Sequence, residues 1–286
     1  MSTAPEVVAS PIELQRRMLE ARARGQRIAF VPTMGYLHEG HLSLLREGRK
    51  RGDILVLSIF VNPTQFGPNE DLARYPRDLA GDLAKAASAG TDLAFVPEPA
   101  AMYPSGYQTY VDVREVSKGQ CGDRRPGHFV GVATVVLKLF NLVQPHVALF
   151  GDKDYQQLQV LRRMVADLDV PVEVVGLPIV READGLAMSS RNAYLGPEER
   201  QHALALSRAL AAARARWAAG ERDARALETA ARAVLEPVPG SRIDYVEVRD
   251  AETLRSIDRA ERAVRLSLAV FIGKTRLIDG ETLSWK

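Results

Sequence analysis

Residues 34–41 read Met34-Gly35-Tyr36-Leu37-His38-Glu39-Gly40-His41, and the rest of the chain is organised around them. This stretch follows a short apolar run, Ile28 to Val31, and precedes a segment in which Leu42, Leu44 and Leu45 are interspersed with polar residues. These patterns predict a strand, a turn and the start of an amphipathic helix. A helix start presents free backbone N–H groups and the positive end of the helix dipole, so the turn is a candidate phosphate site.

The two histidines of this turn limit the kinds of binding site that it can form. His38 and His41 are three residues apart, which places both imidazoles on one face of the first helical turn, and Gly40 leaves the backbone bare for a flat ring. A P-loop is excluded, because His41 and Leu42 stand where Walker A needs lysine and a hydroxyl residue. A zinc-protease helix needs its histidines four apart. For the pair alone an ordinary helix cap is the better interpretation, so the rest of the chain decides.

Composition indicates a soluble globular protein. The 286 residues are 46% hydrophobic and 26% charged, enough for one large or two ordinary domains. The net charge is only +2 and no basic block occurs, so no nucleic-acid partner is expected. Cys121 is the single cysteine. With no signal-peptide pattern and no apolar run of about 18 residues, the sequence predicts a cytoplasmic protein without a membrane partner.

Helix and strand patterns alternate in the first two thirds of the chain. Helices are expected over residues 11–24, 42–51, 77–89, 130–143 and 155–168, and strands over 28–31, 53–60, 93–96, 147–150 and 172–175. This alternation predicts an α/β fold with a Rossmann-like, doubly wound parallel sheet. Ligands of such a sheet lie over the carboxyl ends of its strands.

Polar residues follow two of these strands. Gln65 lies just beyond the strand that ends at Phe60, while Lys153 and Gln157 lie beyond the strand that ends at Phe150. Each glutamine alone is better explained as a solvated loop amide, but a pair beside the histidine turn suits a small polyol or carboxylic acid. Lys153, at a helix start, can reach a phosphate.

The composition changes beyond Arg181. The segment 185–192 is small, polar and led by glycine, and it is expected to be mobile. After it come alanine-rich helices over 197–219 and 224–235 and strands over 243–248, 264–272 and 275–278. Because this order no longer alternates, the sequence predicts a domain of residues 1–184, a smaller α+β domain of residues 185–286, and a functional hinge over 185–192.

Five blocks of the sequence together resemble the pantoate–β-alanine ligase (pantothenate synthetase) family, part of the HIGH-motif nucleotidyltransferase superfamily. The blocks are Pro32 to Gly35, His38 to His41, Phe60 to Phe66, Gly151 to Gln157 and Met188 to Asn192. A HIGH-like turn alone is weakly specific, whereas five blocks in the family's order and spacing are strongly specific. Tyr36 and Asp152 depart from the family at positions that are expected to vary.

The resemblance implies ATP-dependent condensation of (R)-pantoate with β-alanine to pantothenate. A pantoyl adenylate forms first with release of pyrophosphate, and the amine of β-alanine then displaces AMP. Both nucleophiles are substrates, so the protein has to supply positioning and donors for the developing phosphate charge. Residues 1–184 would bind ATP and pantoate, and residues 185–286 would form a lid.

The resemblance also implies roles for individual residues. The catalytic residues would be His38, His41, Lys153 and Arg191. The ATP contacts would be Met34, Gly35, Tyr36, Leu37, His38, Glu39, Gly40, His41, Gly151, Asp152, Lys153, Asp154, Val180, Met188, Ser189, Ser190 and Arg191. Gln65 and Gln157 would bind pantoate, with Gln65 also near β-alanine. Mg²⁺ is expected with ATP, but its protein ligands stay open, because Asp78 and Asp82 could equally form an exposed acidic face.

A homodimer is expected from the resemblance and from the apolar run Val132 to Val143, which has more hydrophobic residues than one buried helix face requires. The alternative is a fully buried core helix. Two other functions compete: another adenylyl or cytidylyl transferase of the superfamily, and a nucleotide-binding regulator without catalysis. The paired glutamines argue against the first, and the complete set of motifs argues against the second.

Overall fold

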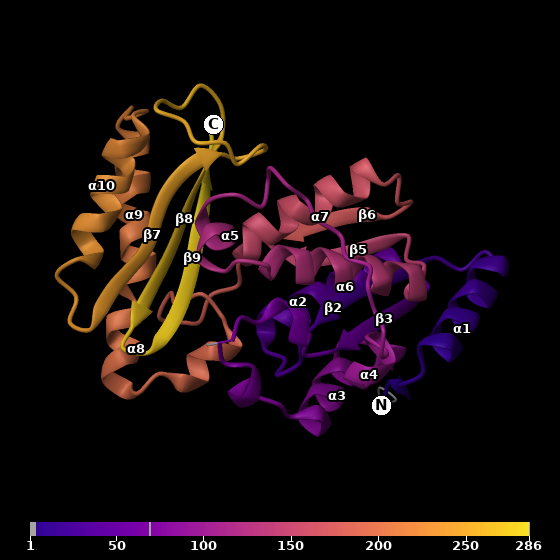
Figure 1. Cartoon of the computed structure of the whole chain (residues 1–286). Helices are drawn as coiled ribbons and strands as arrows, with labels where there is room; N and C mark the ends of the chain where they lie inside the picture. Colours follow the sequence, from indigo (N-terminus) through magenta and orange to yellow (C-terminus); the bar gives the residue numbers. More distant parts are fainter. Residues whose placement is uncertain (1–3, 69, 286) are drawn as a thin grey trace.

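The computed structural model of the chain describes residues 4–68 and 70–285. The strand before the histidine turn, β2 (Ile28–Thr33), lies inside a six-stranded parallel sheet of order β1-β4-β3-β2-β5-β6 (Figure 1). The other strands are β1 (Glu6–Val8), β3 (Ile54–Ile59), β4 (Leu93–Phe95), β5 (Val147–Gly151) and β6 (Glu173–Leu177). The Rossmann-like prediction is confirmed, although the short edge strand β1 was not predicted.

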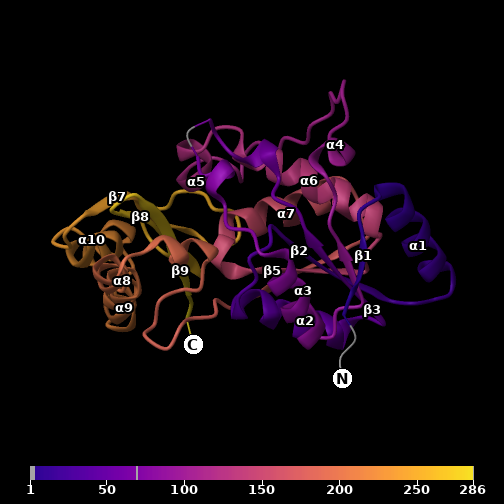
Figure 2. The ribbon, with the colours of Figure 1, turned by 90° about the horizontal axis from the view of Figure 1, so that it is seen from below.

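Helices cover both faces of this sheet. They are α1 (Pro11–Ala23), α2 (Glu39–Arg51), α3 (Leu79–Ser88), α4 (Pro99–Met102), α5 (Gln120–Arg124), α6 (His128–Val143) and α7 (Tyr155–Asp167). Side chains alternate along β2: Ile28 and Phe30 join the core beneath α1, α6 and α7, whereas Ala29 and Val31 join the core beneath α2 and α3. Figure 2 shows the two groups of helices on opposite sides of the sheet.

A crevice opens where the strand order reverses, between β2 and β5. β2 pairs with β3 along six residues but with β5 only at Ala29 and Phe30. The two strands therefore diverge toward their carboxyl ends, which is the switch point at which doubly wound sheets bind ligands. The histidine turn leaves β2 and the Lys153 turn leaves β5 at this point.

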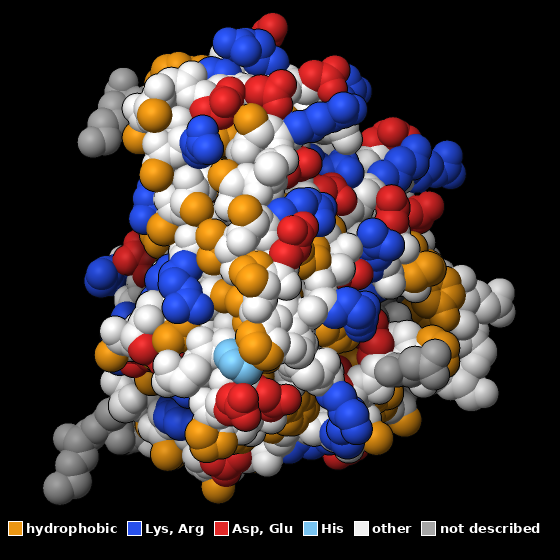
Figure 3. All heavy atoms as spheres, turned by 90° about the vertical axis from the view of Figure 1, so that its left-hand side faces the viewer, with side chains coloured by type: hydrophobic (Ala, Val, Ile, Leu, Met, Phe, Trp, Pro, Cys, Tyr) orange, Lys and Arg blue, Asp and Glu red, His pale blue; other side chains and the backbone are white. Residues whose placement is uncertain are grey.

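The C-terminal unit is a three-stranded antiparallel sheet covered on one face by helices (Figure 1). Its elements are α8 (Pro197–Ala203), α9 (Ala205–Ala218), α10 (Ala224–Leu235), β7 (Ser241–Asp250), β8 (Val264–Ile272) and β9 (Thr275–Leu283). It has a core of its own, to which Leu210, Leu227 and Leu268 belong. The helix expected over 197–219 breaks at Leu204, and β9 runs longer than predicted. Basic and acidic side chains intermingle on its outer side (Figure 3).

The connection between the two units is fixed by hydrogen bonds. The N–H of Met188 donates to the carbonyl of Val180 over 3.0 Å, and the Asn192 amide donates to Glu182 over 2.7 Å. Leu186 packs into the C-terminal core. The boundary predicted near residue 184 falls in this connection, and a hinge over 185–192 stays a prediction.

The apolar helix α6 is buried within a single chain. It packs against α1, α7 and the sheet, and Phe129, Val132, Val136 and Phe140 on its inner face belong to the core of the Rossmann-like domain, whereas Asn141 on the opposite side is exposed. Burial in the core of the chain therefore accounts for the apolar run, which gives no support to a dimer. None of the helices in the described part of the chain is long and apolar enough to cross a membrane.

Candidate active site

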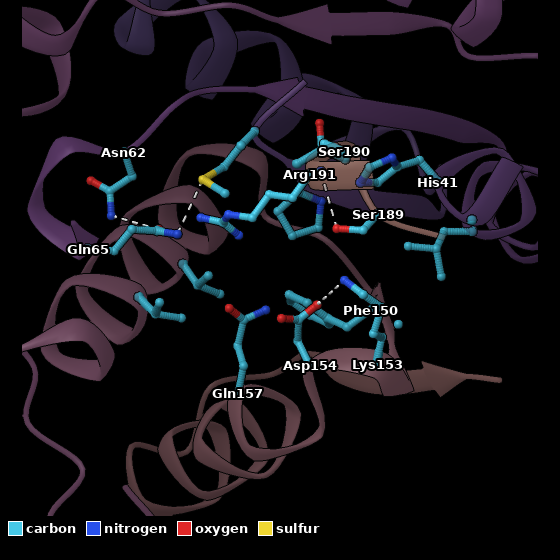
Figure 4. Close-up of a pocket in the computed structure, with 18 of the residues that line it drawn as sticks. His41, Asn62, Gln65, Phe150, Lys153, Asp154, Gln157, Ser189, Ser190 and Arg191 are labelled. Atoms are coloured by element: carbon cyan, nitrogen blue, oxygen red, sulfur yellow. Dashed lines mark hydrogen bonds and ion pairs between the residues drawn. The ribbon is translucent and has the colours of Figure 1, made fainter. Parts of the chain in front are cut away.

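A cavity of about 230 Å³ lies over the carboxyl ends of β2 and β5. It brings together most of the residues that the sequence predicted (Figure 4). These are Met34, His38, Gly40, His41, Gln65, Gly151, Lys153, Asp154, Gln157, Val180, Met188, Ser189, Ser190 and Arg191. The segment 188–191 thus reaches the same cavity as the histidine turn, although about 150 residues separate them in the chain.

The histidine turn caps helix α2 with its own side chains. The N–H of Gly40 donates to Nδ1 of His38 over 3.2 Å, and the N–H of His38 donates to Nδ1 of His41 over 3.3 Å. The ring centroids of His38 and His41 lie 4.1 Å apart. Because each Nδ1 accepts a hydrogen bond, the proton of each neutral ring lies on Nε2. Both rings therefore offer an N–H donor that the cap does not use.

Burial keeps these rings neutral. Burial first, and then the nearby Lys153 charge, lowers the pKa of His38 to about 4. Burial, followed by His38 and Lys153, lowers the pKa of His41 well below its usual value. At neutral pH the two histidines are consequently neutral donors, and the positively charged side chains that line the cavity are Lys153, Arg191 and Arg125.

Asp82 holds the turn from behind and does not form an acidic face. Its side chain is buried, with 1% exposed, and its carboxylate accepts the N–H groups of Tyr36 and Leu37 over 2.8 and 2.6 Å. Gly35 has a φ of +82°, and a Cβ there would lie 2.9 Å from Oδ2 of Asp82. Asp78 instead caps α3 by accepting the N–H of Gly81. The two carboxylates form no shared acidic face, because Asp82 is buried behind the turn and only Asp78 is exposed.

Five predicted ATP contacts do not line the cavity: Gly35, Tyr36, Leu37, Glu39 and Asp152. Leu37 belongs to the core between α2 and the sheet. Glu39 pairs with Arg46, which lies seven residues further along the surface of α2. These residues shape the turns that carry the cavity residues.

A buried amide orients Gln65. Asn62 is 1% exposed, and its Nδ2 donates to Oε1 of Gln65 over 3.1 Å. Its Oδ1 accepts the hydroxyl of Tyr103 over 2.8 Å, which fixes the Asn62 amide. Since Oε1 of Gln65 is occupied, Nε2 is the donor presented to the cavity, where it lies 3.3 Å from the Met34 sulfur. Asn62 lies in the block Phe60 to Phe66, but no local pattern predicted a role for it.

Arg125 and His128 hold the backbone of the Gln65 loop, and no sequence pattern pointed to either residue. The carbonyl of Gln65 lies 2.9 Å from Nδ1 of His128 and accepts Nη2 of Arg125 over 3.3 Å. Arg125 also binds the carboxylate of Glu70 over 2.6 Å. Burial first, and then the Arg125 charge, lowers the pKa of His128 to about 4. Arg125 and His128 lie 60 and 63 residues beyond Gln65 in the sequence, so only the fold brings them to its backbone.

Opposite the polar groups the cavity has an apolar wall. Helix α6 supplies Val132, Val135, Val136 and Leu139, and the strand ends supply Phe60 and Phe150. Gly131 allows η1 (Pro63–Gln65) to lie directly on α6, since a Cβ there would lie 2.4 Å from the carbonyl of Thr64. Gln65 and Gln157 point into the space beside this wall from different elements (Figure 4). A small acid with a branched apolar body matches this combination.

The cationic groups lie at the other side of the cavity. The Nζ of Lys153 is 3.9 Å from the Asp154 carboxylate, and Arg191 makes a bidentate pair with Asp71. Although burial opposes it, the Asp71 carboxylate raises the pKa of Arg191. The hydroxyl of Ser190 donates to the carbonyl of Tyr36 over 3.3 Å, which ties the segment 188–191 to the histidine turn.

A second cavity of about 390 Å³ adjoins the first, between the two units. Both cavities are lined by Arg125, His128, Lys153, Asp154, Gln157, Ser189 and Arg191. The site is therefore elongated, with room for more than one ligand. Among the described residues, no group of three histidine, cysteine, aspartate or glutamate side chains is placed to hold a metal ion.

Comparison with known proteins assigns the family. The family model described as Pantoate-beta-alanine ligase matches residues 6–282. The pantothenate synthetase of Geobacter sulfurreducens is 59% identical over 273 residues, which covers 96% of this chain and 96% of that protein. That of Syntrophotalea carbinolica is 62% identical over 266 residues, covering 93% and 94%.

Solved structures agree with the sequences. A crystal structure of pantothenate synthetase from Thermus thermophilus is 47% identical, with a TM-score of 0.92 over 96% of this chain and 98% of that chain. A pantoate-beta-alanine ligase from Francisella tularensis, complexed with beta-gamma ATP and beta-alanine, is 31% identical, with a TM-score of 0.79 over 97% of each chain. This chain therefore belongs to the pantoate–β-alanine ligase family.

Proposed function

We propose that this chain condenses (R)-pantoate with β-alanine, using ATP, to give pantothenate, AMP and pyrophosphate. The observation that carries the proposal is that neutral paired histidines, three cationic side chains and two glutamines face an apolar wall in one cavity. A nucleotide-binding regulator without catalysis would not require all of these histidines, cationic side chains and glutamines in one cavity. Another adenylyl transferase of the superfamily is not favoured, because the family match spans residues 6–282.

In the first half-reaction the carboxylate of pantoate attacks the α-phosphorus of ATP. Gln65 and Gln157 hold pantoate against the apolar wall, which takes its two methyl groups. His38 and His41 donate Nε2–H bonds to the phosphate oxygens as negative charge develops, and Lys153 adds a positive charge. Donors that are already oriented stabilise this charge without reorganisation, which is how such groups lower a barrier. Val180 contacts the adenosine.

In the second half-reaction the amine of β-alanine attacks the acyl carbon of pantoyl adenylate and AMP leaves. The amine must arrive beside the bound acyl group, and the second cavity opens onto Gln157 and His128 at this point. Gln65 lies close enough to the pantoate site to contact both substrates. No protein nucleophile takes part, since each attacking atom belongs to a substrate.

Residues 185–286 act as a lid over the domain formed by residues 1–184. ATP on an open sheet edge would lie in water, where charge interactions are weak. Closure expels water and brings Met188, Ser189, Ser190 and Arg191 to the phosphates, a common way in which hinged domains complete a site. The hydrogen bond of Ser190 to the histidine turn supports this arrangement.

Three further expectations belong to the same proposal. Mg²⁺ is expected with ATP, where it would neutralise phosphate charge, and its protein ligands stay open because no cluster of carboxylates in the described part of the chain is placed to hold it. A homodimer is expected from the family resemblance alone, and sedimentation at micromolar concentration would distinguish it from a monomer of 31.4 kDa. It acts in the cytoplasm, an expectation that rests on its single cysteine.

An AMP-release assay tests the function. The complete mixture of ATP, pantoate and β-alanine should release AMP, and omission of any one should abolish release above background. Replacement of pantoate by a nucleotidyl-transferase substrate should give no ATP consumption. ATP consumption that is independent of pantoate would contradict the proposal.

A further inference from the structure

Arg265 is a buried arginine that reaches from the C-terminal unit into the Rossmann-like domain. It lies on β8, where its neighbours Val264 and Leu266 belong to the core of the C-terminal unit, so the Arg265 side chain leaves the opposite face of the sheet. Only 3% of Arg265 is exposed. Its Nη2 donates a hydrogen bond of 2.8 Å to the backbone carbonyl of Asp152. Asp152 begins the 3-10 turn that carries Lys153, so this bond joins the C-terminal sheet to the turn beside the cavity.

The guanidinium of Arg265 is enclosed on several sides. Its Cζ lies 4.3 Å from the centroid of the Tyr155 ring, and its Nη1 donates to the hydroxyl of Thr282 over 3.2 Å. Tyr155 in turn donates its hydroxyl to the carbonyl of Ala251 over 2.8 Å. Gly280 provides the space, since a Cβ there would lie 2.8 Å from Nη2 of Arg265. The chain therefore accommodates this side chain with contacts from both units.

Stability alone does not account for a charge in this position. The hydrogen bonds of Arg265 go to a carbonyl and a hydroxyl rather than to a carboxylate, and its buried Nε has no hydrogen-bond partner among the described residues. Burying a guanidinium without full pairing is costly, and apolar residues of similar volume often replace buried charges at no loss of stability. What an apolar residue could not supply is the donor to Asp152.

We propose that Arg265 is a positioning residue, which fixes the turn 152–154 through the Asp152 carbonyl and thereby aims Lys153 at the phosphates of ATP. This inference rests on the proposed function, in which Lys153 contacts the triphosphate. The bond exists only while the C-terminal unit lies against the Rossmann-like domain. Arg265 therefore makes the orientation of Lys153 depend on closure of the lid, so that the complete set of phosphate contacts forms in the closed state.

The experiment is a double-mutant cycle on the single-turnover rate of pantoyl adenylate formation. Arg265→Met removes the donors and keeps most of the length, and it is compared in the wild-type and Lys153→Met backgrounds. Arg214→Met is the matched control, because Arg214 lies in the same unit, 57% exposed, and pairs with Glu281 on β9. The apparent affinity for pantoate is measured in parallel, since pantoate does not depend on Lys153.

In the wild-type background Arg265→Met should lower the adenylation rate on the order of 10- to 100-fold, as a misplaced catalytic group does. In the Lys153→Met background the same change should cost less than about twofold, because coupled residues are not additive. Pantoate affinity and the Arg214→Met rate should stay near those of the wild type. Arg265→Lys keeps the positive charge but loses the planar guanidinium. Its adenylation rate should lie between those of the wild type and Arg265→Met.

Equal losses from Arg265→Met in both backgrounds would show that Arg265 acts independently of Lys153 and would overturn the proposal. So would an unchanged rate in the wild-type background. If Arg265→Met does not fold, the Arg265→Lys pair in the two backgrounds decides the same question. A wild-type protein that makes no adenylate from pantoate and ATP would instead refute the proposed function, so the two failures are distinguishable.

Discussion

Arg191 binds Asp71 through two hydrogen bonds, of 3.0 Å from Nε and 2.9 Å from Nη2, across the mouth of the site. The arginine comes from the segment that joins the two units, and the aspartate from the loop after β3. The cation proposed for the triphosphate is therefore held by a carboxylate of the protein. The pair orients the guanidinium, but the same carboxylate faces the phosphates once Arg191 is removed.

The Arg191–Asp71 pair predicts that removing the arginine weakens ATP binding and that neutralising the aspartate as well restores part of it. Arg191→Ala should lower the adenylation rate and raise the KM for ATP, because the phosphates lose a cation and meet an unpaired carboxylate. Asp71→Asn in the Arg191→Ala background should recover part of the ATP affinity, on the order of fivefold. Steady-state KM values measure both effects. No recovery in the double variant would show that Asp71 does not act on ATP.

His41→Ala should lower the rate of pantoyl adenylate formation on the order of 10² to 10³. Its Nε2–H is a donor aimed at charge that develops in the transition state, so pantoate affinity should change little. Rapid-quench measurement of the adenylate checks the rate, and equilibrium titration checks the affinity. An unaltered adenylation rate would remove His41 from the mechanism.

The order of the two half-reactions can be tested without β-alanine. If pantoyl adenylate forms first, labelled pyrophosphate should exchange into ATP when pantoate is present and β-alanine is absent. Leaving out pantoate is the control and should stop the exchange. A strict requirement for β-alanine would instead indicate a concerted reaction.

Asn62→Ala should weaken pantoate binding more than ATP binding. Removing the Asn62 amide frees Oε1 of Gln65 to rotate into the cavity and leaves the half-buried Tyr103 hydroxyl with only the Thr64 hydroxyl, 3.3 Å away. Loss of a buried hydrogen-bond partner costs about 1–3 kcal/mol, so a rise of roughly tenfold in the KM for pantoate is expected. Asn141→Ala, at an exposed position of α6, is the control. A larger effect on ATP than on pantoate would contradict the assignment of Gln65.

His128 predicts how stability depends on pH. Its pKa is about 4 in the folded protein and about 6.5 when unfolded, so between these values the unfolded chain binds more protons. The contribution of His128 is thus fully present above pH 6.5 and is lost as pH falls toward 4, at no more than about 1.4 kcal/mol per pH unit. Denaturant unfolding at pH 7 and pH 5 should show a larger loss for the wild type than for His128→Gln. Equal losses would mean that His128 is not buried neutral.

Much of the fold followed from local patterns. The apolar runs before His38 and before Gly151 predicted strands, the alternation predicted a parallel sheet, and parallel strands necessarily collect their carboxyl ends at one edge. This shared edge predicted that the histidine turn, Gln65 and Lys153 lie close together. The three-residue strand β1 was missed, because at that length no periodicity distinguishes a strand from a loop.

Periodicity and chain order were enough to predict the longer helices and strands, the parallel arrangement of the sheet and most of the motif residues that meet in the cavity. The tertiary structure alone decided that Asp82 supports the histidine turn, that Asn62 orients Gln65, and that Arg265 reaches the Asp152 carbonyl. It also showed that α6 packs in the core. The apolar sequence of a helix does not tell whether its own chain or a second copy covers it. Hydrogen bonds and burial between residues far apart in the chain depend on where the folded elements come to lie, and local patterns do not contain that information.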